Sequence, residues 1–317
     1  MITLKILGCG GGMPMINRFL SSTLIHYQGK KILLDCGEGT QVAMRNNKTG
    51  FKNIDIICIT HLHGDHIFGL PGLLSTMGNS GRTLPVTIIG CIGIRDAVKG
   101  LLSTIAYLPF ELIIIENPKN PLSITHSSHR LVVEEYSIVN EAEIILNILE
   151  LDHSSSCMGF RFDIIRKAQF NPEKAIALNI PKQFWSTLQK GQTVSYDNKV
   201  YEPNMVLENK RKGLKISYIT DTRPIEAISD FIKGSTLFIC EGTYGDDADL
   251  KKAIKNKHMT FSEAAGLAKS GEVKELLLTH FSTAIENAEI YKSFADDVFE
   301  NTVIAYDGFV KKLSYKH

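Results

Sequence analysis

The stretch His61-Leu62-His63-Gly64-Asp65-His66 follows an apolar run and is the most informative part of the sequence. His61 and His63 alternate at the end of the predicted strand, so their side chains point to one side. The glycine lets the chain turn, and Asp65 and His66 then fold back over the same place from the first turn of the next helix. Four side chains that can bind a metal therefore converge within six residues. Neutral imidazole and carboxylate suit zinc or a similar divalent ion.

Four ligands from one loop cannot complete two metal sites, so other strand ends should supply the rest. His153 follows a second apolar run and precedes a serine-rich turn. Asp221 ends a third run, where a carboxylate can bridge two cations or simply cap the next helix. His280 ends a fourth run in the same way as His61 ends its strand. These residues predict two three-ligand sites that share one bridging carboxylate.

Two other patterns compete with this interpretation. His126 and His129 could also be ligands, but they lie in a polar segment. The run Gly8-Cys9-Gly10-Gly11-Gly12 invites a dinucleotide-binding interpretation. The third glycine of that motif would fall at Met13, and Pro14 follows where a helix should begin, so a tight turn beside the metal site is favoured.

Short apolar runs alternate with helical patterns along almost the whole chain, which predicts sheets packed between helices. The predicted strands cover residues 2–7, 22–27, 32–34, 54–60, 86–89, 111–115, 131–136, 143–152, 214–220, 236–240, 274–279 and 302–305. The predicted helices cover residues 39–47, 66–77, 92–102, 225–232, 261–269 and 286–298. A length of 317 residues permits one α/β domain or two, and composition does not choose between them.

Charge and composition exclude several classes of protein. The chain has 35 Lys and Arg against 34 Asp and Glu, which excludes binding of nucleic acid by bulk charge. Hydrophobic residues make up 44% of the chain, which is too high for a disordered protein. No apolar run reaches the roughly 18 residues of a membrane span. Six scattered cysteines without a CxxC pair indicate buried, reduced thiols in a cytosolic protein.

The segment from about 164 to 213 interrupts the alternating pattern. It contains nine Lys and Arg against four Asp and Glu, so nine minus four gives a net charge of +5. A solvated insertion between strands would account for this composition. The functional alternative is a projecting basic arm that touches phosphates.

In order along nearly the whole chain, the residues resemble the metallo-β-lactamase superfamily and, within it, the ribonuclease Z family, whose members trim tRNA 3′ ends. The histidine motif alone marks the superfamily. A longer form of the motif is much more specific to ribonuclease Z, and it continues through Gly69-Leu70-Pro71-Gly72-Leu73-Leu74. The basic insertion stands where this family has one, which adds to the resemblance. The other matching stretches are 7–14, 34–41, 221–223 and 278–282.

This resemblance implies an αββα sandwich formed by one domain over residues 1–317, with an inserted basic arm at about 164–213 that clamps precursor tRNA. It also implies a cytoplasmic homodimer without a membrane segment. Each subunit is expected to carry two Zn²⁺ ions, or Mn²⁺ in their place.

The resemblance further assigns roles to single residues. The implied zinc ligands are His61, His63 and His153 at one ion, Asp65, His66 and His280 at the other, and Asp221 between them. Asp65 is the implied proton acceptor, and His258 with Glu241 is implied to support proton transfer to the leaving group. The candidate RNA contacts are Arg18, Lys182, Lys190, Lys210, Arg211 and Lys212.

The expected chemistry is hydrolysis of a phosphodiester. Two divalent ions lower the pKa of a shared water to about 7 and neutralise the developing charge. The expected products are a tRNA 3′-hydroxyl and a trailer 5′-phosphate.

Several positions depart from the family pattern, among them Phe19, Met259, Ala284, Ile285 and the arm segment 181–185. These departures motivate two alternatives. One is a related hydrolase that acts on another phosphodiester or a small ester. The other is a metal-bearing RNA-binding protein with weak catalysis or none, although such a protein would not need Asp65, Glu241 and His258.

Overall fold

The computed structural model describes residues 1–127, 129–137, 142–209 and 211–315. Contacts within these residues divide the chain into two units. The larger unit contains Met1–Asp163 and resumes at Leu214, and the smaller unit contains Ile164–Gly213. The smaller unit thus occupies the basic segment of the sequence.

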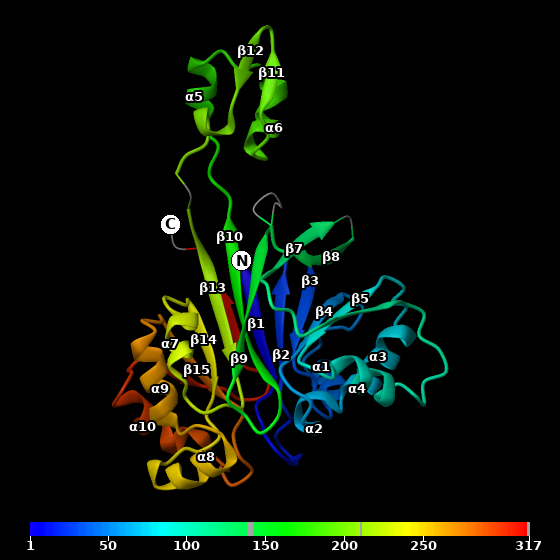
Figure 1. The fold of residues 1–317 in the computed structure, drawn as a ribbon, viewed down its shortest axis with the longest axis vertical. Coiled ribbons are helices and arrows are strands. Elements are labelled where there is room, and N and C mark those ends of the chain that lie inside the picture. The colour runs from blue at the N-terminus through cyan, green and yellow to red at the C-terminus, as the bar shows by residue number, and fades with distance from the viewer. Residues whose placement is uncertain (128, 138–141, 210, 316–317) are drawn as a thin grey trace. The chain divides into compact units, whose positions relative to one another are not determined.

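The first sheet of the larger unit consists of β1 (Ile2–Gly8), β2 (Ser22–Tyr27), β3 (Lys30–Leu34), β4 (Ile54–Ile59), β5 (Val86–Gly90), β6 (Leu112–Glu116) and β17 (Val310–Leu313). Among the described residues, its strand order is β17-β1-β2-β3-β4-β5-β6 (Figure 1). The pairs β17–β1, β1–β2 and β2–β3 are antiparallel, whereas the pairs β3–β4, β4–β5 and β5–β6 are parallel. Every residue of β4 is buried, as expected for a parallel strand with both faces covered.

The second sheet consists of β7 (Leu122–Ser127), β8 (Arg130–Glu135), β9 (Ile144–Leu151), β10 (Cys157–Arg166), β13 (Arg211–Ile219), β14 (Leu237–Glu241), β15 (Leu276–Thr279) and β16 (Thr302–Ile304). Its order, within the same described ranges, is β16-β15-β14-β13-β10-β9-β7-β8. Strands β13 to β16 are parallel, and β7 is antiparallel to both β8 and β9.

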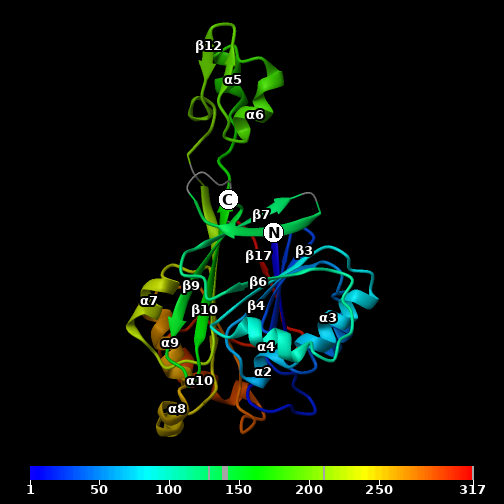
Figure 2. The ribbon, with the colours of Figure 1, turned by 45° about the vertical axis from the view of Figure 1, so that its right-hand side comes forward.

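Helices cover the outer faces of the two sheets. The helices in the first half are α1 (Thr40–Asn46), α2 (Gly64–Ile67), α3 (Leu70–Asn79) and α4 (Ile94–Leu101). Those in the second half are α7 (Glu226–Ile232), α8 (Leu250–Asn256), α9 (Phe261–Ser270) and α10 (Lys292–Asp296). Figures 1 and 2 show α3 and α4 along the first sheet and α7, α9 and α10 along the second. The predicted αββα sandwich is confirmed.

One edge of the sandwich collects the chemically active side chains. Each follows or ends a strand whose carboxyl end lies at this edge: Asp35 after β3, His61 after β4, His153 after β9, Asp221 after β13, Glu241 at the end of β14 and His280 after β15. Parallel strands direct their carboxyl ends to the same edge, so residues far apart in the sequence meet there.

Two predicted helices differ from the structure. The helix predicted over 66–77 is divided into α2 and α3, because the N–H of Gly69 donates to the carbonyl oxygen of Cys36 at 2.9 Å and Pro71 has no N–H. Glycine at position 69 permits this approach, since a Cβ there would lie 2.0 Å from the main-chain oxygen of Gly37. The helix predicted over 286–298 begins as a 3₁₀ turn, Ala288–Tyr291, before α10 starts.

Three strands of the sandwich were missed by the sequence prediction, namely β7, β10 and β17. His126 lies in β7, although its segment reads as polar. In β10 the apolar residues alternate with charged ones such as Arg161 and Asp163, so no continuous apolar run marks the strand. Whether these segments form strands depends more on pairing with neighbouring strands than on local propensity.

The smaller unit contains α5 (Pro172–Ala177), α6 (Trp185–Gln189) and a hairpin of β11 (Val194–Tyr196) and β12 (Lys199–Tyr201). It has a small apolar core of its own, formed by Ala175, Ile180, Leu188, Val194, Tyr201 and Val206. Phe170, Phe184 and Trp185 pack against this core. The segment is therefore an ordered insertion between β10 and β13.

All six cysteines are buried and unpaired, as the sequence predicts. None of the helices in the described part of the chain is both long and apolar enough to cross a membrane.

Candidate metal centre

The structure brings the seven candidate ligands together in two groups that share Asp221. In the first group, Nδ1 of His63 lies 3.1 Å from Nε2 of His61 and 3.2 Å from Nε2 of His153. Oδ2 of Asp221 lies 3.5 Å from Nε2 of His61 and 3.9 Å from Nε2 of His153. Three nitrogens and one oxygen thus lie within 4.8 Å of one another.

The second group contains Asp65, His66 and His280. Nε2 of His66 lies 3.1 Å from Nε2 of His280 and 3.4 Å from Oδ2 of Asp65. Oδ1 of Asp221 lies 3.1 Å from Nε2 of His280 and 3.4 Å from Nε2 of His66. Asp221 therefore faces one group with each of its two oxygens.

Left-handed backbone conformations redirect the chain at three of the strand ends. The φ angles are 56° at Asp35, 47° at Asp221 and 59° at His280. For a residue with a Cβ this conformation costs about 1–2 kcal/mol. Strained conformations of this kind gather at functional sites, where the surrounding structure enforces them.

Hydrogen bonds fix which nitrogen of two histidines carries the proton. Nδ1 of His66 lies 2.9 Å from Oδ2 of Asp35, and Nδ1 of His153 lies 3.1 Å from the carbonyl oxygen of Lys257. Both partners are pure acceptors, so each Nδ1 donates, and Nε2 is the nitrogen of each ring that can offer a lone pair to a cation. This arrangement around a metal ligand orients the ring and raises its basicity.

The electrostatics of both groups fit a divalent cation. Burial lowers the pKa of His61 well below its ordinary value, so this ring is neutral. Burial also opposes a charge on His66, but Asp221 and Asp35 raise its pKa well above the ordinary value. Burial alone would raise the pKa of Asp221, yet His280, His66 and His61 lower it well below the usual range. Ionised oxygens and imidazole lone pairs 3.1–3.5 Å apart repel one another unless positive charge lies between them.

His258 and Glu241 form a pair beside the second group. Nδ1 of His258 lies 3.2 Å from Oε2 of Glu241, which is fully buried. Glu241 also accepts the main-chain N–H groups of Thr222, at 2.7 Å, and Met259, at 3.1 Å. The carboxylate therefore has a fixed orientation and holds the imidazole through Nδ1. Nε2 has no hydrogen-bond partner among the residues that the structure describes.

An open cleft lies over these groups. Asp65, Asp221, His258 and His280 line it together with Gly11, Gly12, Met13, His63, Thr243, Tyr244, Asn256, Ser282 and Thr283. The N–H of Gly12 donates to Oδ2 of Asp65 at 2.6 Å. A Cβ at Gly11 would lie 2.4 Å from a ring carbon of His280. The glycine run thus forms a turn beside the candidate ligands, as the sequence predicts.

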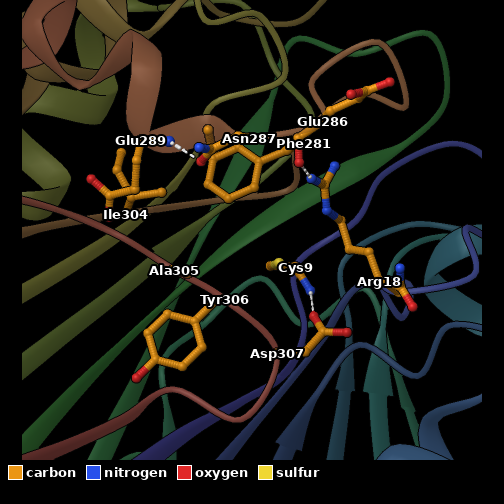
Figure 3. Close-up of a pocket in the computed structure, with 12 residues that line it drawn as sticks. Cys9, Arg18, Phe281, Glu286, Asn287, Glu289, Ile304, Ala305, Tyr306 and Asp307 are labelled. Carbon is orange, nitrogen blue, oxygen red and sulfur yellow. Dashed lines mark hydrogen bonds between the residues drawn. The ribbon is translucent and has the colours of Figure 1, made fainter.

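Arg18, a candidate RNA contact, lines a separate pocket together with Cys9 and Phe281 (Figure 3). Its side chain passes the glycine loop, because a Cβ at Gly10 would lie 3.1 Å from Cδ of Arg18. Its guanidinium donates to the carbonyl oxygens of Ser282, at 3.4 Å, and Glu286, at 3.0 Å. It also lies 5.8 Å from the ring centre of Phe281. The guanidinium therefore joins the loop to the segment that follows His280.

The candidate RNA contacts of the smaller unit differ in their surroundings. Lys182, Lys190 and Lys212 are exposed. Arg211 donates two hydrogen bonds to the carbonyl oxygen of Lys167, at 2.7 Å and 2.9 Å. Lys210 lies outside the described residues.

His126 and His129 are not members of any candidate metal group in the described residues. Three residues that support the site were not identified from the sequence: Asp35, Thr243 and Lys257. Asp35 carries a recognisable signal, because it is a carboxylate directly after a buried strand. Lys257 acts through its carbonyl oxygen, for which a side-chain pattern gives no signal.

Comparison with known sequences finds relatives over the full length of the chain. Ribonuclease Z of Alkaliphilus oremlandii (strain OhILAs) is 55% identical over 317 residues, which are 100% of both chains. Ribonuclease Z of Clostridium tetani (strain Massachusetts / E88) is 53% identical over 317 residues, again 100% of both. Ribonuclease Z of Clostridioides difficile (strain 630) is 52% identical over 315 residues, or 99% of each. A family model described as Anti-Pycsar protein Apyc1 matches residues 2–89.

Comparison with solved structures supports the same fold. Human tRNase Z, short form, superimposes with a TM-score of 0.67 at 24% identity, covering 99% of this chain and 100% of that one. The metallo-β-lactamase fold protein YhfI from Bacillus subtilis gives a TM-score of 0.66 at 19% identity, with coverage of 98% and 100%. The sequence identity over the full length, with which this fold agrees, shows that the chain belongs to the ribonuclease Z family of metal-dependent endonucleases.

Proposed function

We propose that the chain removes the 3′ trailer from precursor tRNA and leaves a tRNA 3′-hydroxyl and a trailer 5′-phosphate. The observation that carries this proposal is that Asp221 faces one ligand group with each oxygen, beneath a cleft that His258 also lines. Hydrolysis of a phosphodiester requires groups that act on the attacking water, on the phosphate charge and on the leaving oxygen. The cleft offers candidates for all three roles, and membership of the ribonuclease Z family supports the substrate class.

We infer that the centre holds two Zn²⁺ ions, or Mn²⁺ in their place. His61, His63 and His153 would hold one ion, Asp65, His66 and His280 the other, and Asp221 would bridge them. When bound, two such ions lower the pKa of a shared water and neutralise charge on the phosphate. The mixed set of imidazoles and carboxylates supports zinc, which binds both kinds of ligand.

Asp65 is the proposed acceptor of the proton from the attacking water. Burial disfavours its charge, but the neighbouring His280 and His66 lower its pKa well below the ordinary value, and the N–H of Gly12 donates to its Oδ2 at 2.6 Å. The carboxylate is therefore ionised at neutral pH and lines the cleft. An ionised carboxylate within reach of the water can act as its general base.

His258 is the proposed proton donor to the departing 3′-oxygen. Burial opposes its positive charge, but Glu241 raises its pKa to about 9. The imidazole therefore holds a proton at neutral pH, and Glu241 leaves Nε2 free to donate it.

We propose that the smaller unit, Ile164–Gly213, binds the tRNA. Its net charge of +5 and its exposed Lys182, Lys190 and Lys212 support contacts with phosphates. Arg211, Lys210 and Arg18 remain candidate contacts of the same kind, and binding by Arg18 would have to replace its hydrogen bonds to carbonyl oxygens.

Substitution of the three exposed lysines by alanine tests the role of this unit. Affinity for precursor tRNA should fall, and the slope of log affinity against log salt should decrease by up to about 3. Hydrolysis of a small phosphodiester should change little. The matched control replaces Lys48, Lys99 and Lys312, which are exposed in the larger unit. An equal loss of tRNA affinity in both variants would contradict the proposal. Deletion of residues 170–205 should lower the affinity and its salt dependence further than the three substitutions do.

We further propose that the protein acts as a homodimer in the cytoplasm, as the family resemblance implies. Light scattering on the eluting protein checks the first point, because a dimer has twice the 35.2 kDa of one chain. A mass of one chain at micromolar concentration would contradict it.

The function as a whole is tested with paired precursor tRNAs, one with an encoded CCA end and one without. Each is incubated with metal-depleted protein to which zinc or manganese is returned. Cleavage directly after the discriminator base is the expected result, and Asp65→Ala should remove it while RNA affinity stays largely unchanged. No cleavage with any divalent ion would overturn the proposal. Rapid turnover of a generic phosphodiester without tRNA binding would indicate a related hydrolase instead.

A further inference from the structure

Thr243 lies between the Glu241–His258 pair and the candidate ligand His280. Its hydroxyl oxygen is 2.5 Å from Oε2 of Glu241 and 3.1 Å from Nδ1 of His280. The side chain is buried, with a residue exposure of 6%. A single hydroxyl thus touches a group proposed for proton transfer and a group proposed for metal binding.

The direction of these hydrogen bonds follows from the chemistry of the partners. A hydroxyl has one proton, and an ionised carboxylate can only accept. The short distance to Glu241 is typical of an O–H group that donates to a carboxylate. The carbonyl oxygen of His280 also lies within reach of this proton, at 3.2 Å, but the ionised carboxylate is closer and is the stronger acceptor. The oxygen of Thr243 then has only lone pairs to offer Nδ1 of His280, so Nδ1 is the donor.

The tautomer of His280 decides whether the ring can bind a cation. With the proton on Nδ1, Nε2 presents a lone pair toward Oδ1 of Asp221, at 3.1 Å, and Oδ2 of Asp65, at 3.4 Å. Without a partner at Nδ1, the proton would move to Nε2, where both carboxylates would accept it. That proton would occupy the place of the metal.

We propose that Thr243 is a positioning residue of the metal centre. Its hydroxyl donates to Glu241 and accepts from Nδ1 of His280, and in this way it holds the ring in its metal-binding tautomer. Glu241 keeps its own place without Thr243, because Thr222 and Met259 donate to it from the main chain. Loss of the hydroxyl should therefore act on His280 and leave the carboxylate where it is. This inference rests on the proposed two-ion centre.

The test compares Thr243→Val, which keeps the shape and removes the hydroxyl, with Thr243→Ser, which keeps the hydroxyl. Zinc affinity of the full chain is measured by competition with a chelator. In the valine variant, one of the two ions should bind about 10–100-fold more weakly, and the serine variant should stay near wild type. Thr302→Val is the matched control, because Thr302 is also buried and donates to the carbonyl oxygen of Phe299 at 2.6 Å.

Nitrogen NMR of the metal-free proteins gives a second, independent measurement. Nδ1 of His280 should carry a proton in wild type and in Thr243→Ser, and it should carry none in Thr243→Val. If wild type binds two ions and the valine variant binds both equally well with the same tautomer, the inference is overturned. If wild type itself binds fewer than two ions, the two-ion centre fails instead. Should the valine variant fail to fold, Thr243→Ala serves in its place.

Discussion

Nδ1 of His66 donates to Oδ2 of Asp35 over 2.9 Å, between two side chains that have no exposed surface. Asp35 also accepts from the main-chain N–H of Thr60, at 2.8 Å, and from the hydroxyl of Tyr218, at 3.0 Å. The hydroxyl comes from the second sheet and the histidine from the first half of the chain. One buried carboxylate therefore ties a candidate ligand to both halves of the sandwich.

Replacement of this carboxylate by Asp35→Asn should weaken metal binding about 10–100-fold. Asparagine tolerates the left-handed backbone at this position, but its NH₂ group would face hydrogen-bond donors. The unsatisfied donors should also lower the free energy of unfolding by about 1–3 kcal/mol. Chelator competition and urea unfolding measure the two effects.

Tyr218→Phe is the control for Asp35→Asn, because it removes one donor and leaves the bond to His66 intact. Its metal affinity should stay within a few-fold of wild type. Wild-type metal affinity in the asparagine variant would show that the carboxylate does not orient the ring.

The leaving group of the substrate should decide how strongly His258→Ala affects the rate. Cleavage of precursor tRNA expels a ribose oxygen that needs a proton, so kcat should fall about 10²–10⁴-fold. A p-nitrophenyl phosphodiester expels a stable anion, so its hydrolysis should fall much less. Steady-state rates on both substrates, with metal content checked, give the comparison.

Glu241→Gln is a useful companion to that variant, since it keeps a hydrogen-bond partner for His258 but removes the negative charge. It should show the same dependence on the leaving group, at smaller amplitude. Equal losses on the two substrates would argue that His258 supports the structure and does not donate a proton.

The sequence predicts the strand ends that carry the candidate ligands better than it predicts some of the strands between them. His61 and His280 stand directly after buried apolar runs, so local pattern alone places them at strand ends. Strand β10, by contrast, alternates apolar and charged residues and becomes recognisable only through its neighbours. Helix α8 was missed although it delivers the carbonyl oxygen of Lys257 to His153.

Thr243 shows a second limit of sequence reasoning about this site. Its role depends on two distances, to Glu241 and to His280, which lie on neighbouring strands or follow them. Spacing along the chain does not reveal which hydroxyl lies between two such side chains. Supporting residues of this kind require the three-dimensional arrangement.

Arg82 and Asp55 form a buried ion pair, 2.8 Å apart, at the end of β4 away from the metal centre. Arg82 also donates to the carbonyl oxygens of Lys52 and Leu84, at 2.7 Å and 2.6 Å. Arg82→Ala should lower the free energy of unfolding by about 3–5 kcal/mol, because it leaves a buried carboxylate without a counter-charge. Urea unfolding provides the measurement.

The double variant Arg82→Ala/Asp55→Ala should be less destabilised than the sum of the two single variants, since it buries no lone charge. Metal affinity should not change in any of them, because β4 separates the pair from His61 by about 20 Å. A purely additive double variant would contradict the coupling.

Asp307 should make stability depend on pH in a direction opposite to that of most carboxylates. Its Oδ1 accepts the main-chain N–H of Cys9 at 3.0 Å (Figure 3). Its Oδ2 accepts the main-chain N–H of Phe19 at 2.6 Å. Burial nevertheless raises its pKa above the ordinary value. The folded protein thus keeps this proton to a higher pH than the unfolded chain does. The stability that the group contributes is fully present below about pH 4 and is lost as pH rises through the raised folded value.

Comparison with Asp307→Asn isolates this contribution, because asparagine does not titrate and every other group is shared by the two proteins. The free energy of unfolding of wild type minus that of the variant should shrink from about pH 4 upward and then level off. Urea unfolding of both proteins at a series of pH values measures this difference. A difference that grew with pH would mean that the two N–H donors outweigh burial and lower the pKa of Asp307 instead.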